Sequence, residues 1–155
     1  MKLRLQPPSI FLKVPLAERV KDKEIAKIAL AMLCLGEASK YHPKSRSPFS
    51  LGSSDPRIIV IFLRLLRQCF DYQIEKTRAT VQCRADQDTN ILQKYWEDVT
   101  KLPARLFYKP LIDHRTFGKP TKNKDYKGVL RIDYFDRRVQ LELESLAQLV
   151  YNYVH

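Results

Sequence analysis

An apolar segment near the start of the chain constrains the fold more than any other part of the sequence. From Ile25 to Gly36 every residue except Lys27 is apolar or glycine, which predicts a helix from about Asp22 to Glu37. A helix that is apolar nearly all round is buried on more than one side. Because the run ends in a single acid, Glu37, we expect that carboxylate at the mouth of a buried helix and not on a solvated face.

The segment from Leu30 to Ala38, at the end of this helix, is L-A-M-L-C-L-G-E-A. It resembles the LAGLIDADG motif of homing endonucleases: three of its nine positions are identical to the motif and four are conservative replacements. Met32 stands in place of a small glycine, and Leu35 in place of the first aspartate. In that family the last acid of the motif binds a divalent cation against the scissile phosphate. The resemblance therefore implies a catalytic, Mg²⁺-binding role for Glu37, with Gly36 beside it in the metal site.

The chain carries one copy of this motif, whereas in the family two such helices pack side by side. The resemblance therefore implies a homodimer, in which the helix 22–37 pairs with the same helix of a second copy and brings two Glu37 carboxylates together. Met32 is expected to loosen this pairing or to change its geometry. The residues expected in the dimer interface are Ala26, Ala29, Leu30 and Leu33.

The charge of the chain favours a polyanionic partner. The net charge is +11 at pH 7, and the segment from Lys101 to Arg138 contains eleven Lys or Arg against four Asp or Glu. Such a cluster is the expected electrostatic footprint of a phosphate-binding surface, with nucleic acid as the first candidate partner and an anionic membrane as the second. A basic, ribosome-associated protein is the alternative interpretation.

The segment from Lys76 to Arg84 alternates with a period of two, which predicts a half-buried strand. One face of this strand is small and apolar, and the other carries no acid. Arginine and glutamine side chains can form paired hydrogen bonds with guanine and adenine edges, and a β-ribbon fits the major groove of DNA. An ordinary solvated strand face is the alternative. The residues of the polar face, which we expect to contact DNA, are Lys76, Arg78, Thr80, Gln82 and Arg84.

Three further regions supply candidate DNA contacts. The turn-rich segment 40–48 follows Glu37 closely, so its cations would flank the metal and the phosphates. The basic segment 114–127 predicts a mobile loop between two strands that clamps a nucleic-acid backbone, and a plain solvated hairpin loop is the alternative. Arg131 lies on the outward face of a strand, and Arg137 and Arg138 are candidates for the auxiliary basic residue of the family. The expected contacts in the two loops are Lys40, Lys44, Arg46, Arg115, Lys119, Lys122, Lys124 and Lys127.

The order of the remaining elements predicts an α+β fold. Besides the helix 22–37, the pattern predicts helices at 56–70 and 88–100, a loop or weak strand at 40–48, and strands at 49–51, 76–84, 105–109 and 128–135. After Asp136 the pattern fits a helix and, as far as Glu144, also a strand. The order resembles the LAGLIDADG domain, αββαββα with a curved antiparallel sheet, with one inserted helix around Trp96. Residues 19–155 would form this single domain, behind a basic arm at 1–18 with a short strand at 10–14.

The cysteines and the apolar runs indicate the compartment. Cys34, Cys69 and Cys83 are odd in number and lie in apolar segments, which predicts core thiols in a reducing cytoplasm and not disulfides or zinc ligands. No signal-peptide pattern is visible, and no apolar run has the length of a membrane span. We therefore expect a cytoplasmic protein with no membrane partner, or an organellar one if it is intron-encoded.

The leading hypothesis is a double-stranded DNA-binding protein of the homing-endonuclease type, which cleaves specific sites as a Mg²⁺-dependent homodimer. One alternative is a non-catalytic DNA-binding regulator, in which Glu37 is only a helix-end residue. The second alternative, suggested by charge alone, is an RNA-binding protein.

Overall fold

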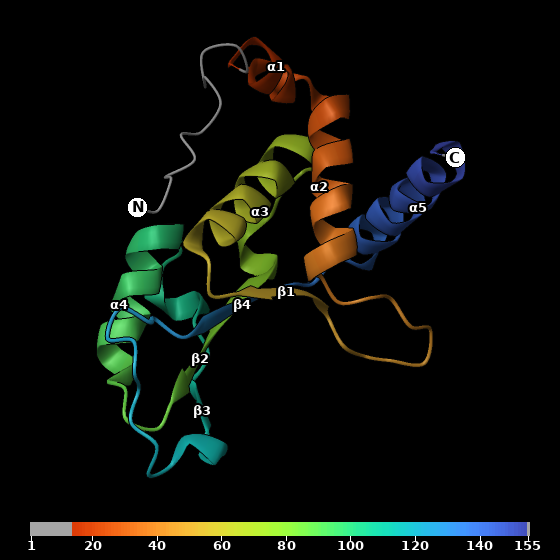
Figure 1. The fold of residues 1–155 in the computed structure, drawn as a ribbon. Coiled ribbons are helices and arrows are strands. Elements are labelled where there is room, and N and C mark those ends of the chain that lie inside the picture. Colours follow the sequence, from red (N-terminus) through yellow and green to blue (C-terminus); the bar gives the residue numbers. More distant parts are fainter. Residues whose placement is uncertain (1–13, 155) are drawn as a thin grey trace, which may run out of the picture.

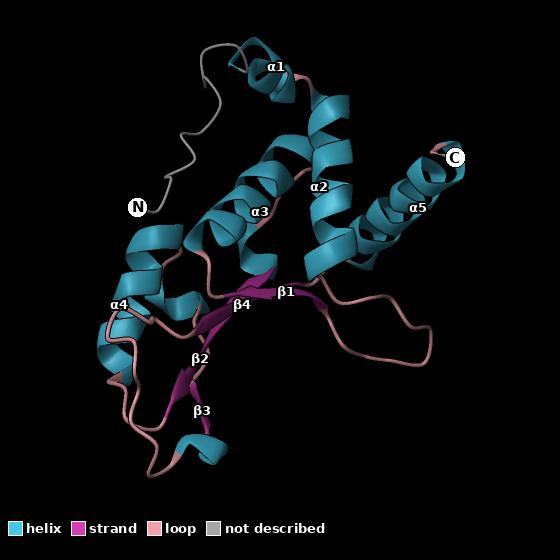
Figure 2. Ribbon diagram, in the orientation of Figure 1, coloured by secondary structure: helices cyan, strands magenta, loops and turns pink. Residues whose placement is uncertain are grey.

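The computed structural model describes residues 14–154, which form an α+β fold of five α-helices and a four-stranded mixed sheet (Figure 1, Figure 2). Helix α2 lies between α3 and α5, and α4 packs against α3 and β2 (Figure 1). The elements are α1 (Val14–Glu18), α2 (Lys23–Glu37), β1 (Phe49–Ser53), α3 (Pro56–Cys69), β2 (Thr77–Arg84), α4 (Thr89–Thr100), β3 (Leu111–Asp113), β4 (Val129–Tyr134) and α5 (Arg137–Tyr153).

The four long helices begin where an aspartate caps them. The carboxylate of Asp22 accepts hydrogen bonds from the amides of Glu24 and Ile25 at 2.9 and 3.2 Å, which satisfies amides that have no partner inside α2. The predicted helices at 22–37, 56–70 and 88–100 are confirmed to within a few residues. The aspartates that cap α3, α4 and α5 in the same way are Asp55, Asp88 and Asp136.

The segment after Asp136 forms a helix and not a strand. Val139, Leu143 and Ala147, which are four residues apart, are buried along one side of α5, whereas Leu141 is 40 % exposed. A strand would have placed residues 139, 141 and 143 on the same face. The helical spacing therefore buries Val139, Leu143 and Ala147 together, and it also packs Leu146 against the core.

Strand β4 lies at the centre of the sheet, whose order is β1-β4-β2-β3. It runs antiparallel to β1 and to β2, so that Arg131 pairs with Gly52 on one side and with Thr80 on the other. Helices cover one face of the sheet. The opposite face, here called the open face, carries alternate residues of the three long strands: Ser50, Gly52, Arg78, Thr80, Gln82, Arg84, Val129, Arg131 and Asp133.

The core lies between the helices and the inner face of the sheet. Leu30 of α2 and Leu66 of α3 are both fully buried there. Trp96 of α4 is also fully buried, and its indole N–H donates a hydrogen bond to the carbonyl oxygen of Lys127 at 2.9 Å. All three cysteines are buried and unpaired, and burial raises the pKa of the Cys34 thiol to about 12. Their predicted location in the core is therefore confirmed.

The sheet differs from the predicted antiparallel one in its edge strand. Strand β3 runs parallel to β2, and it begins at Leu111 and not within 105–109. Residues Ala104–Leu106 form a 3₁₀ turn, and Phe107 makes only an isolated bridge with Ala79. Pro110 has no backbone N–H to donate to a neighbouring strand, so it separates this bridge from β3.

The segment 40–48 is a loop, so the first of its two predicted forms is confirmed and the weak strand is wrong. Ala38, directly after α2, makes one isolated bridge with Leu51, and the chain then leaves the sheet until β1. Pro43 and Pro48 lack the N–H groups that a longer ladder would need. The resulting loop projects away from the body of the molecule (Figure 1).

Residues 1–13 and 155 lie outside the described part of the chain. Most of the predicted basic arm and of its predicted strand at 10–14 falls there, and Val14 begins the short helix α1. Within residues 14–154, no helix combines the length and the apolar character that a bilayer crossing requires.

Candidate functional site

Glu37 is exposed at the end of α2, so the expectation that its carboxylate avoids a solvated face is wrong. No hydrogen bond or ion pair involves this carboxylate among the described residues. Next to it, the ammonium of Lys40 donates hydrogen bonds to the carbonyl oxygens of Cys34, Leu35 and Ala38 at 2.9, 2.6 and 3.1 Å. Lys40 therefore satisfies the last carbonyls of the helix and opposes the negative end of its dipole. This position differs from the predicted phosphate contact, because the ammonium already has three acceptors.

The donors at this helix end suit magnesium in kind but not in number. Mg²⁺ prefers oxygen ligands and is often held by one or two carboxylates together with substrate phosphates and waters. The Glu37 carboxylate and the Gly36 carbonyl are oxygen donors of this type. Within residues 14–154, however, no group of three or more His, Cys, Asp or Glu side chains could hold a metal ion. The described residues at this helix end therefore supply one carboxylate and one carbonyl oxygen, and phosphates, waters or a second carboxylate would have to provide the other ligands.

Helix α2 exposes an apolar face that differs from the predicted dimer interface. Ala26 and Leu30 are fully buried in the core, where a partner helix cannot reach them, and Ala29 and Leu33 are half-buried. The exposed side carries Ile25, Ile28 and Leu35, which are 41, 42 and 53 % exposed. Residues at these spacings share one side of a helix. The α2 apolar face, as we call it, consists of Ile25, Ile28, Ala29, Met32, Leu35 and Gly36.

Gly36 lies at the lower end of the α2 apolar face, beside Glu37. A Cβ added to Gly36 would meet nothing within 4 Å, so no close packing within the described chain requires a glycine there. Glycine in a helix is unfavourable relative to alanine. The α2 apolar face therefore ends in a place where another backbone could approach closely.

Two of the cations predicted on strand 76–84 are engaged at its start. The ammonium of Lys76 donates a hydrogen bond to the Asp136 carboxylate at 2.9 Å, which holds the pKa of that carboxyl below its usual value. The guanidinium of Arg78 donates to the backbone oxygens of Glu75 and Thr77 at 2.9 and 2.7 Å. Lys76 therefore anchors the start of α5, and Arg78 is held close to its own strand.

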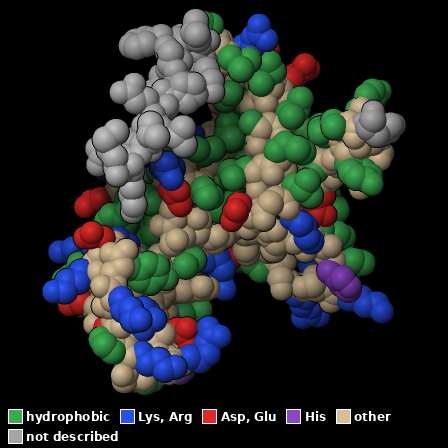
Figure 3. Space-filling view, viewed as in Figure 1, with side chains coloured by type: hydrophobic (Ala, Val, Ile, Leu, Met, Phe, Trp, Pro, Cys, Tyr) green, Lys and Arg blue, Asp and Glu red, His purple; other side chains and the backbone are tan. Residues whose placement is uncertain are grey.

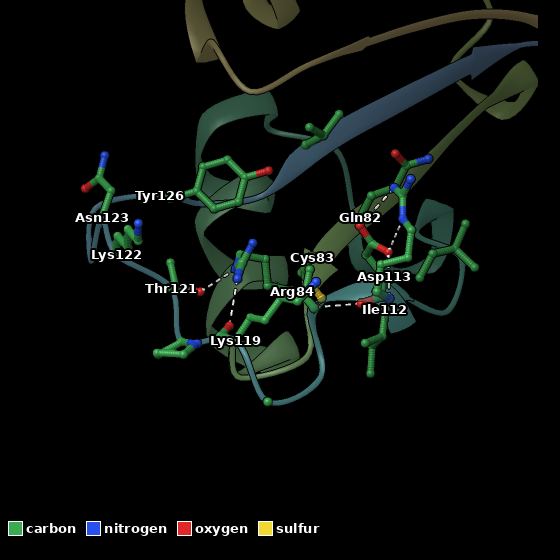
Figure 4. A pocket seen from close by; sticks show the side chains of 16 residues that line it. Gln82, Cys83, Arg84, Ile112, Asp113, Lys119, Thr121, Lys122, Asn123 and Tyr126 are labelled. Atoms are coloured by element: carbon green, nitrogen blue, oxygen red, sulfur yellow. Dashed lines mark hydrogen bonds and ion pairs between the residues drawn. The ribbon is translucent and has the colours of Figure 1, made fainter.

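A pocket of about 1060 Å³ lies at the other end of the open face, between β2, β3 and the segment 114–127 (Figure 4). We call it the basic pocket, because five of the predicted DNA contacts line it. The ring of Tyr126 and the amide of Asn123 also line it, and sequence reasoning missed both. The predicted contacts that the fold brings together there are Gln82, Arg84, Arg115, Lys119 and Lys122.

Hydrogen bonds fix the shape of the basic pocket. The guanidinium of Arg84 donates to the Thr121 hydroxyl at 3.0 Å and to the carbonyl oxygen of Lys119 at 2.7 Å, which ties β2 to the loop (Figure 4). Arg115 forms a bidentate pair with Asp113 at 2.9 and 3.0 Å and lowers the pKa of that carboxyl. The segment 114–127 is therefore a wall held against the sheet and not a plain hairpin loop.

A second basic group lies at the opposite end of the sheet, on the loop after α2. Lys44 and Arg46 are exposed there, and Arg137 donates a hydrogen bond to the carbonyl oxygen of Ser45 at 2.9 Å. Arg138 is exposed beside it. Lys and Arg side chains accordingly gather at the two lower ends of the molecule, and hydrophobic side chains cover the upper helices (Figure 3). Of the predicted contacts in segment 114–127, Lys124 and Lys127 lie outside both groups, and the ammonium of Lys127 is 5.8 Å from the centroid of the Tyr95 ring.

The centre of the open face contains an acid whose contact the sequence did not reveal. Asp133 is only 2 % exposed, and its carboxylate accepts a hydrogen bond from the Ser50 hydroxyl at 2.6 Å. Its Oδ1 also lies 3.2 Å from Nε of Arg131. The alternation of strand 128–135 predicts that Asp133 faces outward, but only the pairing of β1 with β4 brings Ser50 to it.

Comparison of the chain with protein-family models, with curated proteins and with solved structures found no match. The function has to be inferred from the open face, the two basic groups and the lone carboxylate at the end of α2.

Proposed function

We propose that this protein binds double-stranded DNA with the open face of its sheet, as a homodimer joined through the α2 apolar face. In its catalytic form it is a LAGLIDADG-type endonuclease that cleaves DNA with Mg²⁺ held by two copies of Glu37. The proposed fold relationship is to the αββαββα domain, from which this chain departs by the loop at 40–48, the inserted α4 and the parallel edge strand β3.

The character of the open face carries the proposal for DNA. Its side chains are mainly arginines, a glutamine, hydroxyls and small residues, with one acid, Asp133, and the basic pocket and the loop after α2 extend the positive charge at its two ends. Asp113 and Asp133 each lie against an arginine, so neither presents an uncompensated charge to a phosphate.

Double-stranded DNA is favoured over structured RNA by the shape of this surface. The candidate contacts project from strands, and the major groove of B-DNA admits a two-stranded ribbon. The major groove of A-form RNA is deep and narrow, and side chains cannot reach its base edges. A competition between duplex DNA and structured RNA for the protein should therefore favour the DNA.

The α2 apolar face supports the homodimer. Three large aliphatic side chains, Ile25, Ile28 and Leu35, are exposed in a row on a helix whose other side is packed. Gly36 leaves room at the end of this row for a close approach. Pairing of two copies there would cover the row and would bring two Glu37 carboxylates near the same axis.

In the catalytic form, Glu37 holds the metal with its carboxylate, and Gly36 can add its backbone carbonyl. Bound Mg²⁺ supplies orientation of the attacking water and stabilisation of charge on the phosphate. Lys40 holds the last turn of α2 together through its three hydrogen bonds to carbonyl oxygens, which keeps the Glu37 backbone in a fixed position. The cations at both ends of the open face hold phosphates on either side.

A non-catalytic DNA-binding regulator is the second candidate. The observation that favours it is the absence, within residues 14–154, of any group of three potential metal ligands. In this case Glu37 is only the last residue of α2, and the open face and its basic flanks act as described.

The first experiment incubates the protein with supercoiled plasmid, in Mg²⁺ and in EDTA, beside Glu37→Gln and the control Glu24→Gln. Glu24 is an exposed acid in the first turn of the same helix. Mg²⁺-dependent nicking that Glu37→Gln removes and Glu24→Gln retains would support the endonuclease. Retained DNA binding without cutting by any of the three proteins, with Mn²⁺ as well, would support the regulator.

Binding itself is tested by the salt dependence of the affinity. If the cations neutralise six or more phosphates, affinity for duplex DNA should fall by about a thousandfold between about 50 and 200 mM salt. Affinity for duplex DNA that is undetectable at low salt would contradict both candidates.

A further inference from the structure

Arg131 stands at the centre of the open face, where its neighbours leave space around it. It belongs to the central strand, and the residues paired with it are Gly52 on β1 and Thr80 on β2. Neither of these residues has a long side chain, and the Arg131 side chain is 38 % exposed. An approaching ligand can therefore reach the end of this side chain from the open face.

The inner part of Arg131 is held by an acid on the same strand. Asp133 is two residues further along β4, so both side chains leave the same face. Its carboxylate lies 3.2 Å from Nε of Arg131, close enough for charge attraction, although the N–H is not aligned for a hydrogen bond. The Ser50 hydroxyl donates to the same oxygen at 2.6 Å. Asp133 is thus fixed from β1 and faces the inner nitrogen of the guanidinium.

The outer nitrogens of Arg131 differ from those of the other arginines on the open face. Arg78 donates to two backbone oxygens, and Arg84 donates to Thr121 and to the Lys119 carbonyl. For Arg131, by contrast, residues 14–154 provide no hydrogen-bond acceptor to either terminal nitrogen. Beside it, the Thr80 hydroxyl is also buried without a partner. Polar atoms of this kind are costly unless a ligand or water pairs with them.

We propose that Arg131 is the residue that determines specificity for a guanine in the major groove, and that Asp133 and Ser50 are its positioning residues. Two parallel N–H groups at the end of a guanidinium match O6 and N7 of guanine. Attraction between Asp133 and Nε limits the rotation of the side chain and directs these groups outward, which reduces the ordering cost of binding. This proposal rests on the proposed binding of duplex DNA by the open face.

The experiment selects bound sequences from a randomised duplex pool, using the full chain and its Arg131→Lys variant. Lysine keeps the charge but loses the bidentate geometry. We expect one guanine in each half-site to be enriched by the wild-type protein, with other bases there binding about 5- to 150-fold more weakly. Arg131→Lys should lose this preference at that position alone and keep its affinity for non-specific DNA. Arg64→Lys, an exposed arginine on α3 that is not among the proposed DNA contacts, is the control and should keep the preference.

Two further variants test the positioning residues. Ser50→Ala keeps the carboxylate and removes its hydrogen bond, and Asp133→Asn removes the charge that faces Arg131. Both should weaken the guanine preference at the Arg131 position without changing the salt dependence of non-specific binding. Thermal unfolding of each variant checks that the fold is kept, and Ser50→Ala provides the test if Asp133→Asn does not fold.

The possible outcomes separate this inference from the function on which it rests. Duplex binding with a sequence preference that Arg131→Lys leaves intact, or with no preference, would overturn the role of Arg131 and leave the proposed DNA binding standing. A preference that Arg131→Lys removes but Ser50→Ala and Asp133→Asn retain would overturn the positioning role. Absence of any duplex binding by the wild-type protein would overturn the proposed function itself.

Discussion

Helices α2 and α3 lie side by side and are both rich in apolar residues. Packing within one chain explains the pattern of α3, but it does not explain the apolar residues on the exposed side of α2. In α3, the residues Ile59, Phe62 and Leu66 point into the core, and Arg57, Arg64 and Arg67 point to solvent. In α2, Ala26, Leu30 and Ala31 are equally well buried, but the opposite side carries Ile25, Ile28 and Leu35.

This difference indicates which surface of the molecule contacts a partner. A helix that packs one stripe against a core is stable with polar residues on its other side, as α3 demonstrates. The aliphatic residues on the exposed side of α2 leave about half of their surface in water in such a monomer, and exposed apolar groups mark an interaction surface when they are contiguous. The comparison therefore favours a second copy on the α2 apolar face, and three predictions test it.

The largest expected effect is the loss of stability when a buried leucine is replaced by alanine, and it should be equal in the two helices. Leu30→Ala in α2 and Leu66→Ala in α3 each remove a fully buried side chain, so each should lower the free energy of unfolding by about 2–5 kcal/mol. Urea denaturation of both variants in an Ile28→Asp background measures the loss without a contribution from dimer formation. A cost under about 1 kcal/mol for Leu30→Ala alone would contradict the packing of α2.

The second prediction concerns the exposed sides of the two helices, where the same substitution should affect dimer formation only in α2. Ile28 of α2 and Ile61 of α3 are 42 and 48 % exposed, so an aspartate should cost each monomer equally little. In a dimer joined through α2, however, Ile28→Asp buries a charge and should raise the dissociation constant at least about 100-fold.

Light scattering across a concentration series measures this difference. Ile61→Asp should dimerise like the wild-type protein, whereas Ile28→Asp should be monomeric at the same concentrations. A wild-type protein that is monomeric throughout, or two variants that weaken the dimer equally, would remove the distinction between the helices.

The smallest effect should be at Gly36. In the monomeric Ile28→Asp background, Gly36→Ala should stabilise the fold by up to about 1 kcal/mol, because alanine is the better helix former and open space surrounds the position. In the wild-type background the same methyl group should weaken the dimer if two backbones meet there. Thermal unfolding and the dimer dissociation constant give the two values; a dimer unchanged by Gly36→Ala would show that the approach is not close at this residue.

The sequence predicted the helices better than the sheet, for local reasons. Asp22, Asp55 and Asp88 cap the amides within three residues of themselves, so their effect is visible in a short window. The parallel edge strand β3 has three residues and depends on pairing with β2, more than twenty-five residues earlier. No periodicity in so short a segment distinguishes it from the neighbouring segment 105–109.

The candidate site was predicted in its composition but not in its arrangement. The alternation of strand 76–84 correctly indicated that Gln82 and Arg84 share one face. It could not indicate that Arg84 donates to Thr121 or that Lys76 donates to Asp136, because the folded chain alone brings these residues together. The sequence likewise did not reveal that Lys40 donates to three carbonyl oxygens at the end of α2. The contact of the buried Asp133 with Ser50 was missed for the same reason.

The central position of β4 has a consequence for how the molecule folds. Neither β1 nor β2 has its main partner until β4, the last strand along the chain, is available between them. Such long-range pairings form slowly, because the chain loses loop-closure entropy before the strand contacts stabilise it. Helices α2 and α3, by contrast, are close in sequence and can associate early. We therefore expect the open face, on which Arg131 is the central side chain, to be the last part of the molecule to assemble.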